Sequence, residues 1–227
     1  MAVKKLLPKW FKRPVKKAWQ HQQLRRAVRK IASLDQGELP DRQLLAELIS
    51  GWSNEGYVAK LEYLNEVAVR SLESRGPILE CGSGITTLLL GLLCAPRKVE
   101  VWTLEHSPEW EKLLTRELRT NGIAGVHICS APLISFGEFD WYDCSIHEMP
   151  QEFSLVVCDG PPGSTRGGRY GLMPIMDKRL PPGSVVLLDD AERPDEMELM
   201  RRWEKEYGFE SEVIGSDNHK FAVMKRI

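Results

Sequence analysis

Hydrophobic positions along the chain follow two different periods, and the change between them indicates the fold class. Between residues 41 and 75, apolar residues recur at the i, i+3, i+4 spacing of amphipathic helices. After Gly76 and Pro77, short apolar runs typical of buried strands alternate with helical segments. Such alternation predicts parallel strands joined by crossover helices, and therefore an α/β fold.

The strand pattern predicts one sheet with an unusual ending. Apolar runs predict strands at residues 78–81, 99–105, 126–130, 153–158 and 185–188. The last two strands, residues 210–214 and 221–227, are separated by the hairpin signal of residues 215–218. We therefore expect a doubly wound, mostly parallel seven-stranded sheet with an antiparallel C-terminal hairpin and an N-terminal helical extension.

Charge divides the chain into two parts. Residues 1–34 contain 11 Lys or Arg and no acid, whereas the remainder holds 20 basic and 32 acidic residues. We predict a basic extension over residues 1–34 and a main domain with a helical lead-in over residues 35–227. Pro8 and Pro14 are expected to interrupt any continuous helix in the extension.

The basic extension allows several interpretations, because its lysines are interleaved with apolar residues. These apolar residues are Leu6, Leu7, Trp10, Phe11, Val15 and Trp19. The segment suits a solvated leader, an arm on a partner subunit, an anionic membrane surface, or a nucleic-acid backbone. The acidic main domain argues against a nucleic-acid substrate.

Cysteine usage and hydropathy point to a cytoplasmic protein. The five cysteines are scattered, without the spacing of a zinc site or of a secreted disulfide framework. No stretch approaches the roughly 20 apolar residues of a membrane span, and the N-terminus lacks the apolar core of a signal peptide. We expect a soluble protein, with at most peripheral contact at the inner face of a membrane.

The segment around Gly82 carries the first chemical signal. Glu80 precedes Gly82, Ser83 and Gly84 at the end of the first predicted strand, and a helical apolar run follows. A glycine turn between strand and helix lets a ligand approach the backbone closely. Glu105 ends the second predicted strand, where a carboxylate can accept both hydroxyls of a ribose.

Together these motifs resemble a known family. With Glu80 to Gly84, Glu105, Asp159 and the terminal hairpin, residues 41–227 resemble the class I S-adenosylmethionine-dependent methyltransferases, which have a Rossmann-like fold. Residues 159–163, the following Arg169 and Tyr170, and the upstream residues 52–57 resemble bacterial methyltransferases of the catechol O-methyltransferase-like type. The resemblance implies an S-adenosylmethionine-dependent enzyme that O-methylates a small hydroxylated metabolite, a sugar or a glycan.

The resemblance also implies a set of cofactor-binding residues. Glu80 attracts the ammonium of the methionine end, Glu105 binds the ribose, and Asp159 lies near the cofactor. The other implied contacts are Gly82, Ser83, Gly84, Thr87, His106, Ala131, Pro132, Trp52 and Asn54. Many relatives place Asp or Asn near Ala131, and this chain does not. Alternatively, Thr87 packs against the strand and Trp52 is a core residue.

Three carboxylates follow the fourth and fifth predicted strands and are the candidate catalytic and metal-binding residues. Asp159, Asp189 and Asp190 would repel one another unless a cation or a proton is shared. Relatives hold a metal at such a place, which implies Mg²⁺ or another divalent cation. Pro162 stands where those relatives keep a lysine base. The structural alternative is that Asp190 caps the helix near Pro194 and Asp189 accepts backbone N–H groups.

A glycine-rich loop after the fourth strand supplies the candidate substrate residues. Arg166, Arg169 and Tyr170 are placed to cover an acceptor, and the arginines suit a phosphate or carboxylate; a solvated loop is the alternative. His219, in the hairpin, reaches the acceptor only in a favourable register, so we assign no base to it.

Two other functions compete with methyl transfer. A glycine turn followed by a ribose acid also serves an NAD(P)-dependent oxidoreductase, although Thr87 replaces the third glycine of that motif. The second rival is a non-catalytic scaffold with the methyltransferase fold that acts through its basic arm.

Overall fold

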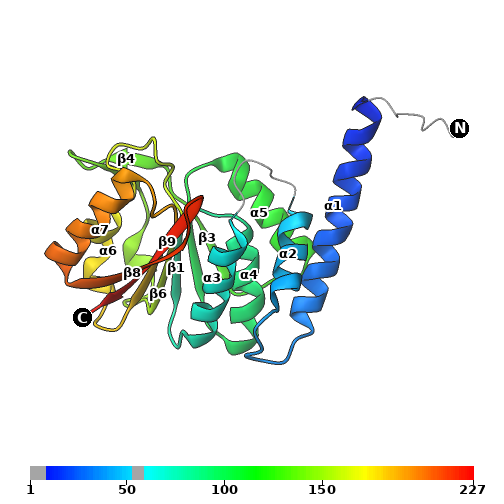
Figure 1. The fold of residues 1–227 in the computed structure, drawn as a ribbon, viewed down its shortest axis with the longest axis horizontal. Coiled ribbons are helices and arrows are strands. Elements are labelled where there is room, and N and C mark those ends of the chain that lie inside the picture. Colours follow the sequence, from blue (N-terminus) through cyan, green and yellow to red (C-terminus); the bar gives the residue numbers. More distant parts are fainter. Residues whose placement is uncertain (1–8, 53–58) are drawn as a thin grey trace, which may run out of the picture.

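The centre of the molecule is a seven-stranded sheet with the order β3-β2-β1-β6-β7-β9-β8 (Figure 1). The computed structural model describes residues 9–52 and 59–227, with side chains from residue 18 onward. The strands of this sheet are β1 (Ile78–Cys81), β2 (Val101–Glu105), β3 (Val126–Ser130), β6 (Leu155–Cys158), β7 (Val185–Leu188), β8 (Phe209–Ser216) and β9 (His219–Arg226). Strands β1, β2, β3, β6 and β7 are parallel, and β9 runs antiparallel to β7. The sheet predicted from the sequence is confirmed, including its antiparallel hairpin.

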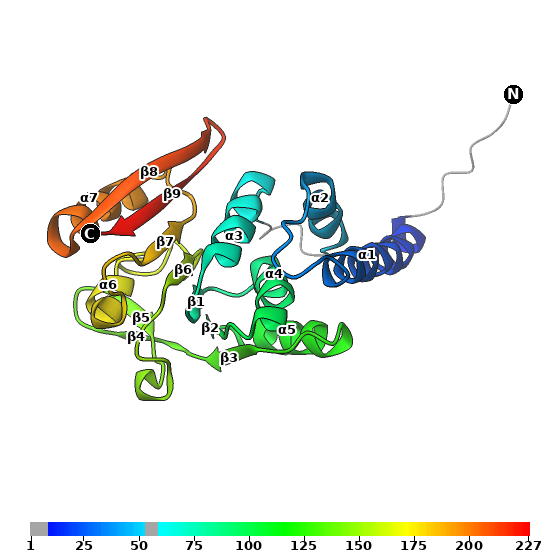
Figure 2. The ribbon, with the colours of Figure 1, turned by 90° about the horizontal axis from the view of Figure 1, so that it is seen from below.

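Helices cover the two faces of the sheet in separate groups (Figure 2). One face packs against α3 (Leu61–Glu73), α4 (Ile85–Cys94) and α5 (Pro108–Thr120), and α1 (Lys9–Ala32) and α2 (Arg42–Gly51) pack on the outside of these helices. The other face packs against α6 (Leu172–Met176), α7 (Pro194–Tyr207) and a small antiparallel sheet of β4 (Leu133–Ser135) and β5 (Asp140–Tyr142). Short 3₁₀ helices lie at Ala95–Arg97, Ile146–Glu148 and Asp177–Arg179. Both strand faces are therefore buried, as expected for parallel strands.

Local signals in the sequence set several boundaries. The Ser107 side chain accepts a hydrogen bond from the Trp110 N–H and caps α5, whose first residue is Pro108. Gly208 ends α7 with a φ of 68°, in the left-handed region that glycine adopts without strain. Both boundaries therefore follow from the local residue types.

Helix α1 departs from the prediction. It runs unbroken from Lys9 to Ala32 and includes Pro14, so the expected interruption at Pro14 is wrong. A proline removes one N–H donor from a helix, and here the turns on either side remain helical. The second half of α1 buries Leu24, Val28 and Ile31 in the same apolar cluster as α2 and α4.

Two short features are absent from the sequence-based prediction. Strands β4 and β5 have three residues each, and α6 has five, which is too short for a hydrophobic period to be recognised. Tyr142, on β5, becomes important at the site described below. Within the described residues, no helix combines the length and apolar character of a membrane span.

Candidate functional site

A cavity of about 1020 Å³ opens at the carboxyl edge of the parallel strands. Its walls come mainly from the segments that follow β1, β2, β6 and β7, at residues 82–86, 105–113, 159–169 and 189–193. The strand order reverses between β1 and β6, because the chain passes outward from β1 to β3 before returning beside β1. Ligands of doubly wound sheets bind at this kind of topological switch point.

The glycine turn after β1 forms part of the cavity wall. Gly82 has a φ of 85°, and a Cβ there would come within 3.0 Å of the Gly160 backbone. Only glycine fits at this position, where the turns after β1 and β6 pack against each other. A Cβ on Gly84, by contrast, would meet no atom within 4 Å. Gly84 therefore leaves open space for a ligand.

Glu105 lies at the end of β2 and lines the same cavity. Its side chain is 1% exposed. One carboxylate oxygen accepts hydrogen bonds from the backbone N–H of Ser83, at 3.2 Å, and from the Ser83 hydroxyl. The other accepts the Ser107 N–H at 2.7 Å. Glu105 thus ties the turn after β1 to the turn after β2.

Glu80 occupies a different environment from the one predicted. It is fully buried, is not among the residues that line the cavity, and accepts hydrogen bonds from three threonine hydroxyls at 2.6–2.8 Å. These donors are Thr86, Thr87 and Thr103. Burial raises the pKa of Glu80 to about 7, although the three donors oppose this rise. Side chains alternate along a strand, so Glu80 points away from Cys81, towards the first turn of α4.

The remaining predicted cofactor residues are divided between the cavity and the core. His106 and Asp159 line the cavity, as do Ser83 and Gly84. Thr87 lies under the turn, where its hydroxyl also accepts the Gly84 N–H at 2.9 Å. Ala131 and Pro132 are not among the lining residues.

The upstream predicted residues lie beside the cavity or outside the described part of the chain. Trp52 is 4% exposed and packs edge-on against Trp110, which lines the cavity, with ring centroids 6.1 Å apart. Asn54 lies outside the described residues.

Several lining residues were not predicted from the sequence. Tyr142 presents a buried hydroxyl that has no hydrogen-bond partner among the described residues. Its strand, β5, gives no recognisable sequence signal. Trp110 donates its indole N–H to the Ser83 carbonyl at 2.8 Å. Lys60 and Arg193 add positive charge to the lining.

The three predicted catalytic carboxylates do lie together, and an arginine lies between two of them. The Arg169 guanidinium, whose side chain is 2% exposed, donates to an Asp159 carboxylate oxygen at 3.1 Å and to an Asp190 carboxylate oxygen at 2.9 Å. It also donates to the backbone carbonyls of Asp159 and Asp189. Removal from water and the Asp189 carboxylate raise the pKa of Asp159, while the Arg169 charge opposes both effects. The cation that this acidic cluster requires is therefore Arg169.

The remaining charges of the cluster are also paired. The Nε2 atom of His219 lies 2.8 Å from an Asp189 carboxylate oxygen, and Arg193 pairs with Asp190 at 2.8 Å. The hydrogen bond to Asp189 raises the pKa of His219 above its usual value, although partial burial opposes the rise. Asp190 has a φ of 59°, a strained conformation for a residue other than glycine.

Metal-ligand geometry differs from the prediction. In the described part of the chain, the ligand atoms of Asp189, Asp190 and His219 lie within 4.8 Å of one another, and Asp159 does not belong to this group. Asp190 does not cap α7, because the residue at the cap position is Arg193 and no side chain caps that helix.

The predicted substrate loop does not act as one unit. Arg166 is exposed and pairs with Asp140 on β5, and Tyr170 lies beneath the Arg202 guanidinium, 3.9 Å from its ring centroid. Neither residue lines the cavity. Arg169 is buried in the acidic cluster instead of being available to cover a substrate.

No protein-family model and no curated protein sequence matches the chain significantly. Structural comparison does find similar folds. The precorrin-6y C5,15-methyltransferase of Geobacter metallireducens aligns with a TM-score of 0.58 at 14% identity, over 76% of this chain and 91% of that one. The SAH-bound methyltransferase PaMTH1 of Podospora anserina aligns with a TM-score of 0.54 at 14% identity, over 99% and 100%.

A third protein with the same fold is an rRNA methyltransferase. The 16S rRNA N2 G1207 methyltransferase of T. thermophilus, in complex with AdoMet and guanosine, aligns with a TM-score of 0.53 at 17% identity, over 78% of this chain and 46% of that one. The precorrin-6y methyltransferase and the rRNA methyltransferase act on different kinds of acceptor, and they share the fold. The chain has the fold of the class I S-adenosylmethionine-dependent methyltransferases, as its sequence motifs indicated.

Proposed function

We propose that this protein is an S-adenosylmethionine-dependent methyltransferase that acts on a hydroxyl group. The proposal rests on one observation: the Glu105 carboxylate and the open space at the Gly84 turn line the same cavity, at the switch point of the sheet. A carboxylate beside a backbone that can be closely approached suits a ribose joined to a charged tail. The shared fold supports the same conclusion, since similar structures hold SAH or AdoMet.

The lining residues suggest how the cofactor binds. Glu105 accepts hydrogen bonds from the ribose hydroxyls, and the Tyr142 hydroxyl, which has no partner within the described ranges, offers a further polar contact. Asp159, whose side chain is 38% exposed, is the carboxylate available to the ammonium group. Glu80 is enclosed by three hydroxyl donors, so we assign it the role of holding the turn in shape instead of contacting the cofactor.

His219 is the residue best placed to remove a proton from the acceptor. It lines the cavity, and Asp189 fixes its ring through Nε2. The acceptor hydroxyl gives its proton to His219 as its oxygen attacks the methyl carbon. Bound S-adenosylmethionine supplies the methyl group, and its sulfur keeps the electron pair of the broken carbon–sulfur bond.

A divalent cation shared by Asp159, Asp189 and Asp190 does not fit this arrangement. Arg169 already bridges Asp159 and Asp190, so a metal ion between them would be placed against a buried guanidinium. Binding to Asp189, Asp190 and His219 instead would displace His219 from Asp189 and compete with Arg193. We therefore propose transfer that does not require a metal ion.

The acceptor is proposed to be a small hydroxylated metabolite or a sugar of a glycan. The cavity holds about 1020 Å³, which leaves room for such a group beside the cofactor. The lining carries both signs of charge, with Lys60 and the Asp190-paired Arg193 beside several carboxylates, so it selects no single charge on the acceptor.

Binding and turnover experiments separate this proposal from its two rivals. We expect S-adenosylmethionine, and not NAD, to raise the melting temperature of the protein, because a ligand that binds only the folded state stabilises it. Methyl transfer to a panel of hydroxylated acceptors then distinguishes an enzyme from a scaffold. A shift with NAD alone would favour the oxidoreductase, and S-adenosylmethionine binding without transfer to any acceptor would favour the scaffold.

A further inference from the structure

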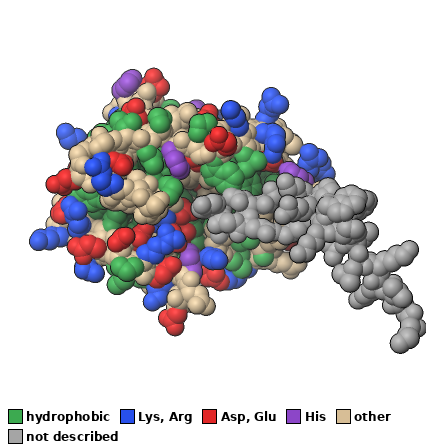
Figure 3. Space-filling view, turned by 90° about the horizontal axis from the view of Figure 1, so that it is seen from above, with side chains coloured by type: hydrophobic (Ala, Val, Ile, Leu, Met, Phe, Trp, Pro, Cys, Tyr) green, Lys and Arg blue, Asp and Glu red, His purple; other side chains and the backbone are tan. Residues whose placement is uncertain are grey.

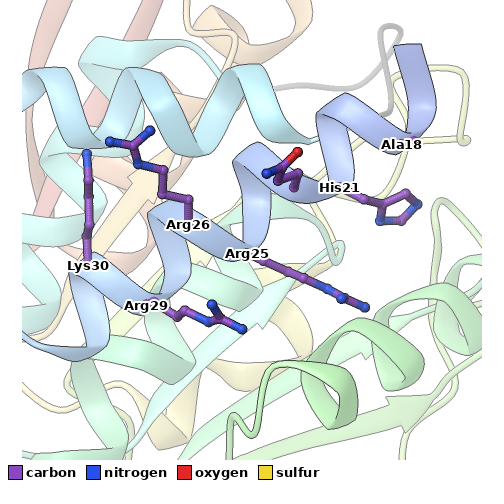
Figure 4. A pocket seen from close by; sticks show the side chains of 7 residues that line it. Ala18, His21, Arg25, Arg26, Arg29 and Lys30 are labelled. Carbon is purple, nitrogen blue, oxygen red and sulfur yellow. The ribbon is translucent and has the colours of Figure 1, made fainter. Parts of the chain in front are cut away.

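The exposed side of α1 is basic over residues 25–30. Leu24, Ala27, Val28 and Ile31 face the core, which leaves Arg25, Arg26 and Arg29 exposed together with His21 and Trp19. Figure 4 shows Arg25 and Arg29 on one side of the helix and Arg26 and Lys30 on the other. A shallow hollow lies among these side chains. The helix therefore presents a positive surface over two turns.

Within the described ranges, ion pairs neutralise only part of this surface. Lys30 pairs with Glu47 at 2.6 Å, whereas no carboxylate of residues 18–52 or 59–227 lies within 4.0 Å of Arg25, Arg26 or Arg29. The sequence of α1 itself contains no acid. Because the chain beyond residue 34 carries an excess of acids, the molecule has a strong charge asymmetry with α1 at its positive end.

The position of α1 relates this surface to the cavity. Lys30 contacts Glu47 in the middle of α2, and the Leu24 backbone abuts Gly51 at the end of α2. Residues 9–22 of α1 thus extend past the carboxyl end of α2, over about 20 Å of helix. Trp52, which directly follows α2, packs against Trp110 of the cavity lining. Figure 1 shows this part of α1 rising beyond the body of the molecule. Figure 3 views that side from above, where acidic and basic side chains of the main domain are intermixed.

We propose that α1 binds the surface of an anionic membrane and brings the mouth of the cavity to it. Arginines attract acidic headgroups, and Trp19, which is 52% exposed, suits the boundary between headgroups and acyl chains. Apolar residues interleaved with lysines in residues 1–19 favour a lipid surface over nucleic acid, whose backbone offers no apolar phase. The proposal stands apart from the methyl-transfer function, since it requires neither cofactor nor acceptor.

Vesicle binding of the full chain tests the proposal. Wild-type protein should sediment with vesicles that contain phosphatidylglycerol and remain free with pure phosphatidylcholine, and 0.5 M salt should weaken binding. The triple variant Arg25→Glu, Arg26→Glu and Arg29→Glu should bind on the order of 100-fold more weakly, since each basic residue near such a surface is worth about 1 kcal/mol. Trp19→Ala should weaken binding less.

A matched control changes the same total charge elsewhere. Lys98, Lys205 and Lys225 are exposed on other elements, and replacing all three with Glu should leave most vesicle binding intact. Equal loss in the control and in the α1 variant would overturn the proposal, because net charge alone would then explain binding. Binding to short DNA or RNA with no binding to anionic vesicles would also overturn it. Circular dichroism of each variant checks that the fold is retained.

Discussion

Two groups of carboxylates lie at the same edge of the sheet and are stabilised in opposite ways. At the ends of β1 and β2, Glu80 and Glu105 receive hydrogen bonds from hydroxyls and backbone N–H groups. At the ends of β6 and β7, Asp159, Asp189 and Asp190 are paired with Arg169, Arg193 and His219. The first group uses uncharged donors and the second uses cations.

This difference follows from what each group can tolerate and what it is proposed to do. Uncharged donors fix a carboxylate in place without adding a charge, which suits a turn that shapes a binding site. Three adjacent acids repel one another, and the buried Arg169 offsets part of that repulsion, although the pKa of Asp159 stays raised. The β6–β7 end thereby holds a cluster of paired acids beside His219, where proton transfer is proposed.

Replacing Arg169 should have the largest effect. Arg169→Gln leaves Asp159 and Asp190 without their shared cation, and removing one partner of a buried ion pair typically costs 3–5 kcal/mol. We expect a clear loss in the free energy of unfolding by urea titration. Arg193→Gln is the matched control: it also pairs with Asp190 but is 48% exposed, so its loss should lie near 0–1 kcal/mol. Similar losses in the two variants would contradict the role given to Arg169.

Removing the proposed base should reduce turnover without reducing cofactor affinity. His219→Asn is expected to lower kcat by about 10²–10⁴-fold, the usual contribution of general base catalysis. Asp189 raises the pKa of His219 and Glu192 and Asp190 add to this rise, so the wild-type rate should fall as the pH drops through a value above 6.5. Initial rates measured from pH 5 to 9 check this limb. An acid limb that persists unchanged in His219→Asn would exclude His219 as its origin.

Glu80 should make the free energy of unfolding depend on pH. Its pKa is about 7 in the folded chain and near 4.5 when unfolded, so the folded state holds the proton more tightly and stability falls as the pH rises between these values. Glu80→Gln does not ionise. The variant should therefore gain up to about 2–3 kcal/mol relative to wild type between pH 4.5 and 8, measured by thermal or urea unfolding. A constant difference across that range would show that Glu80 is ionised in the folded protein.

Glu105 should affect cofactor binding more than stability. Glu105→Gln is expected to weaken S-adenosylmethionine binding by about tenfold or somewhat more, because hydrogen bonds to a charged group are worth about 1.5–3 kcal/mol. Isothermal titration calorimetry measures the change. Glu109→Gln serves as the control, since Glu109 lines the same cavity but is exposed. Equal loss in both variants would argue against a specific ribose contact at Glu105.

A chelator should have the smallest effect. If Arg169 supplies the positive charge of the acidic cluster, dialysis against EDTA should leave the rate of methyl transfer unchanged. Added Mg²⁺ or Mn²⁺ should not increase it. Loss of activity in EDTA that a divalent cation restores would instead favour a metal ion at Asp189, Asp190 and His219.

Much of the fold can be predicted from the sequence, because hydrophobic period, helix caps and glycines act locally. Ser107 and Pro108 start α5, Gly208 ends α7, and the run from Ile78 to Cys81 forms a strand buried on both faces. The short β4, β5 and α6 escape prediction, because three to five residues hold too few repeats of the hydrophobic period to be recognised. Tyr142 is missed with them.

Site residues can be predicted from the sequence where they directly follow a parallel strand, because the end of the strand places them at the carboxyl edge of the sheet. The acids at the ends of β1, β2, β6 and β7 were recognised because parallel strands end at one edge. Their environments depend on side-chain direction, which places Glu80 among threonines below the turn and Glu105 in the lining of the cavity.

The sequence by itself determined the secondary structure pattern, the sheet with its antiparallel ending, and the acids at the strand ends, since these depend on local spacing and chain order. Only the tertiary structure decided which charged side chains form ion pairs. Arg169 enters the acidic cluster from a loop, and His219 reaches Asp189 from the neighbouring antiparallel strand β9, 30 residues along the chain. Such pairings depend on strand register and loop path, and no local pattern in the sequence specifies them.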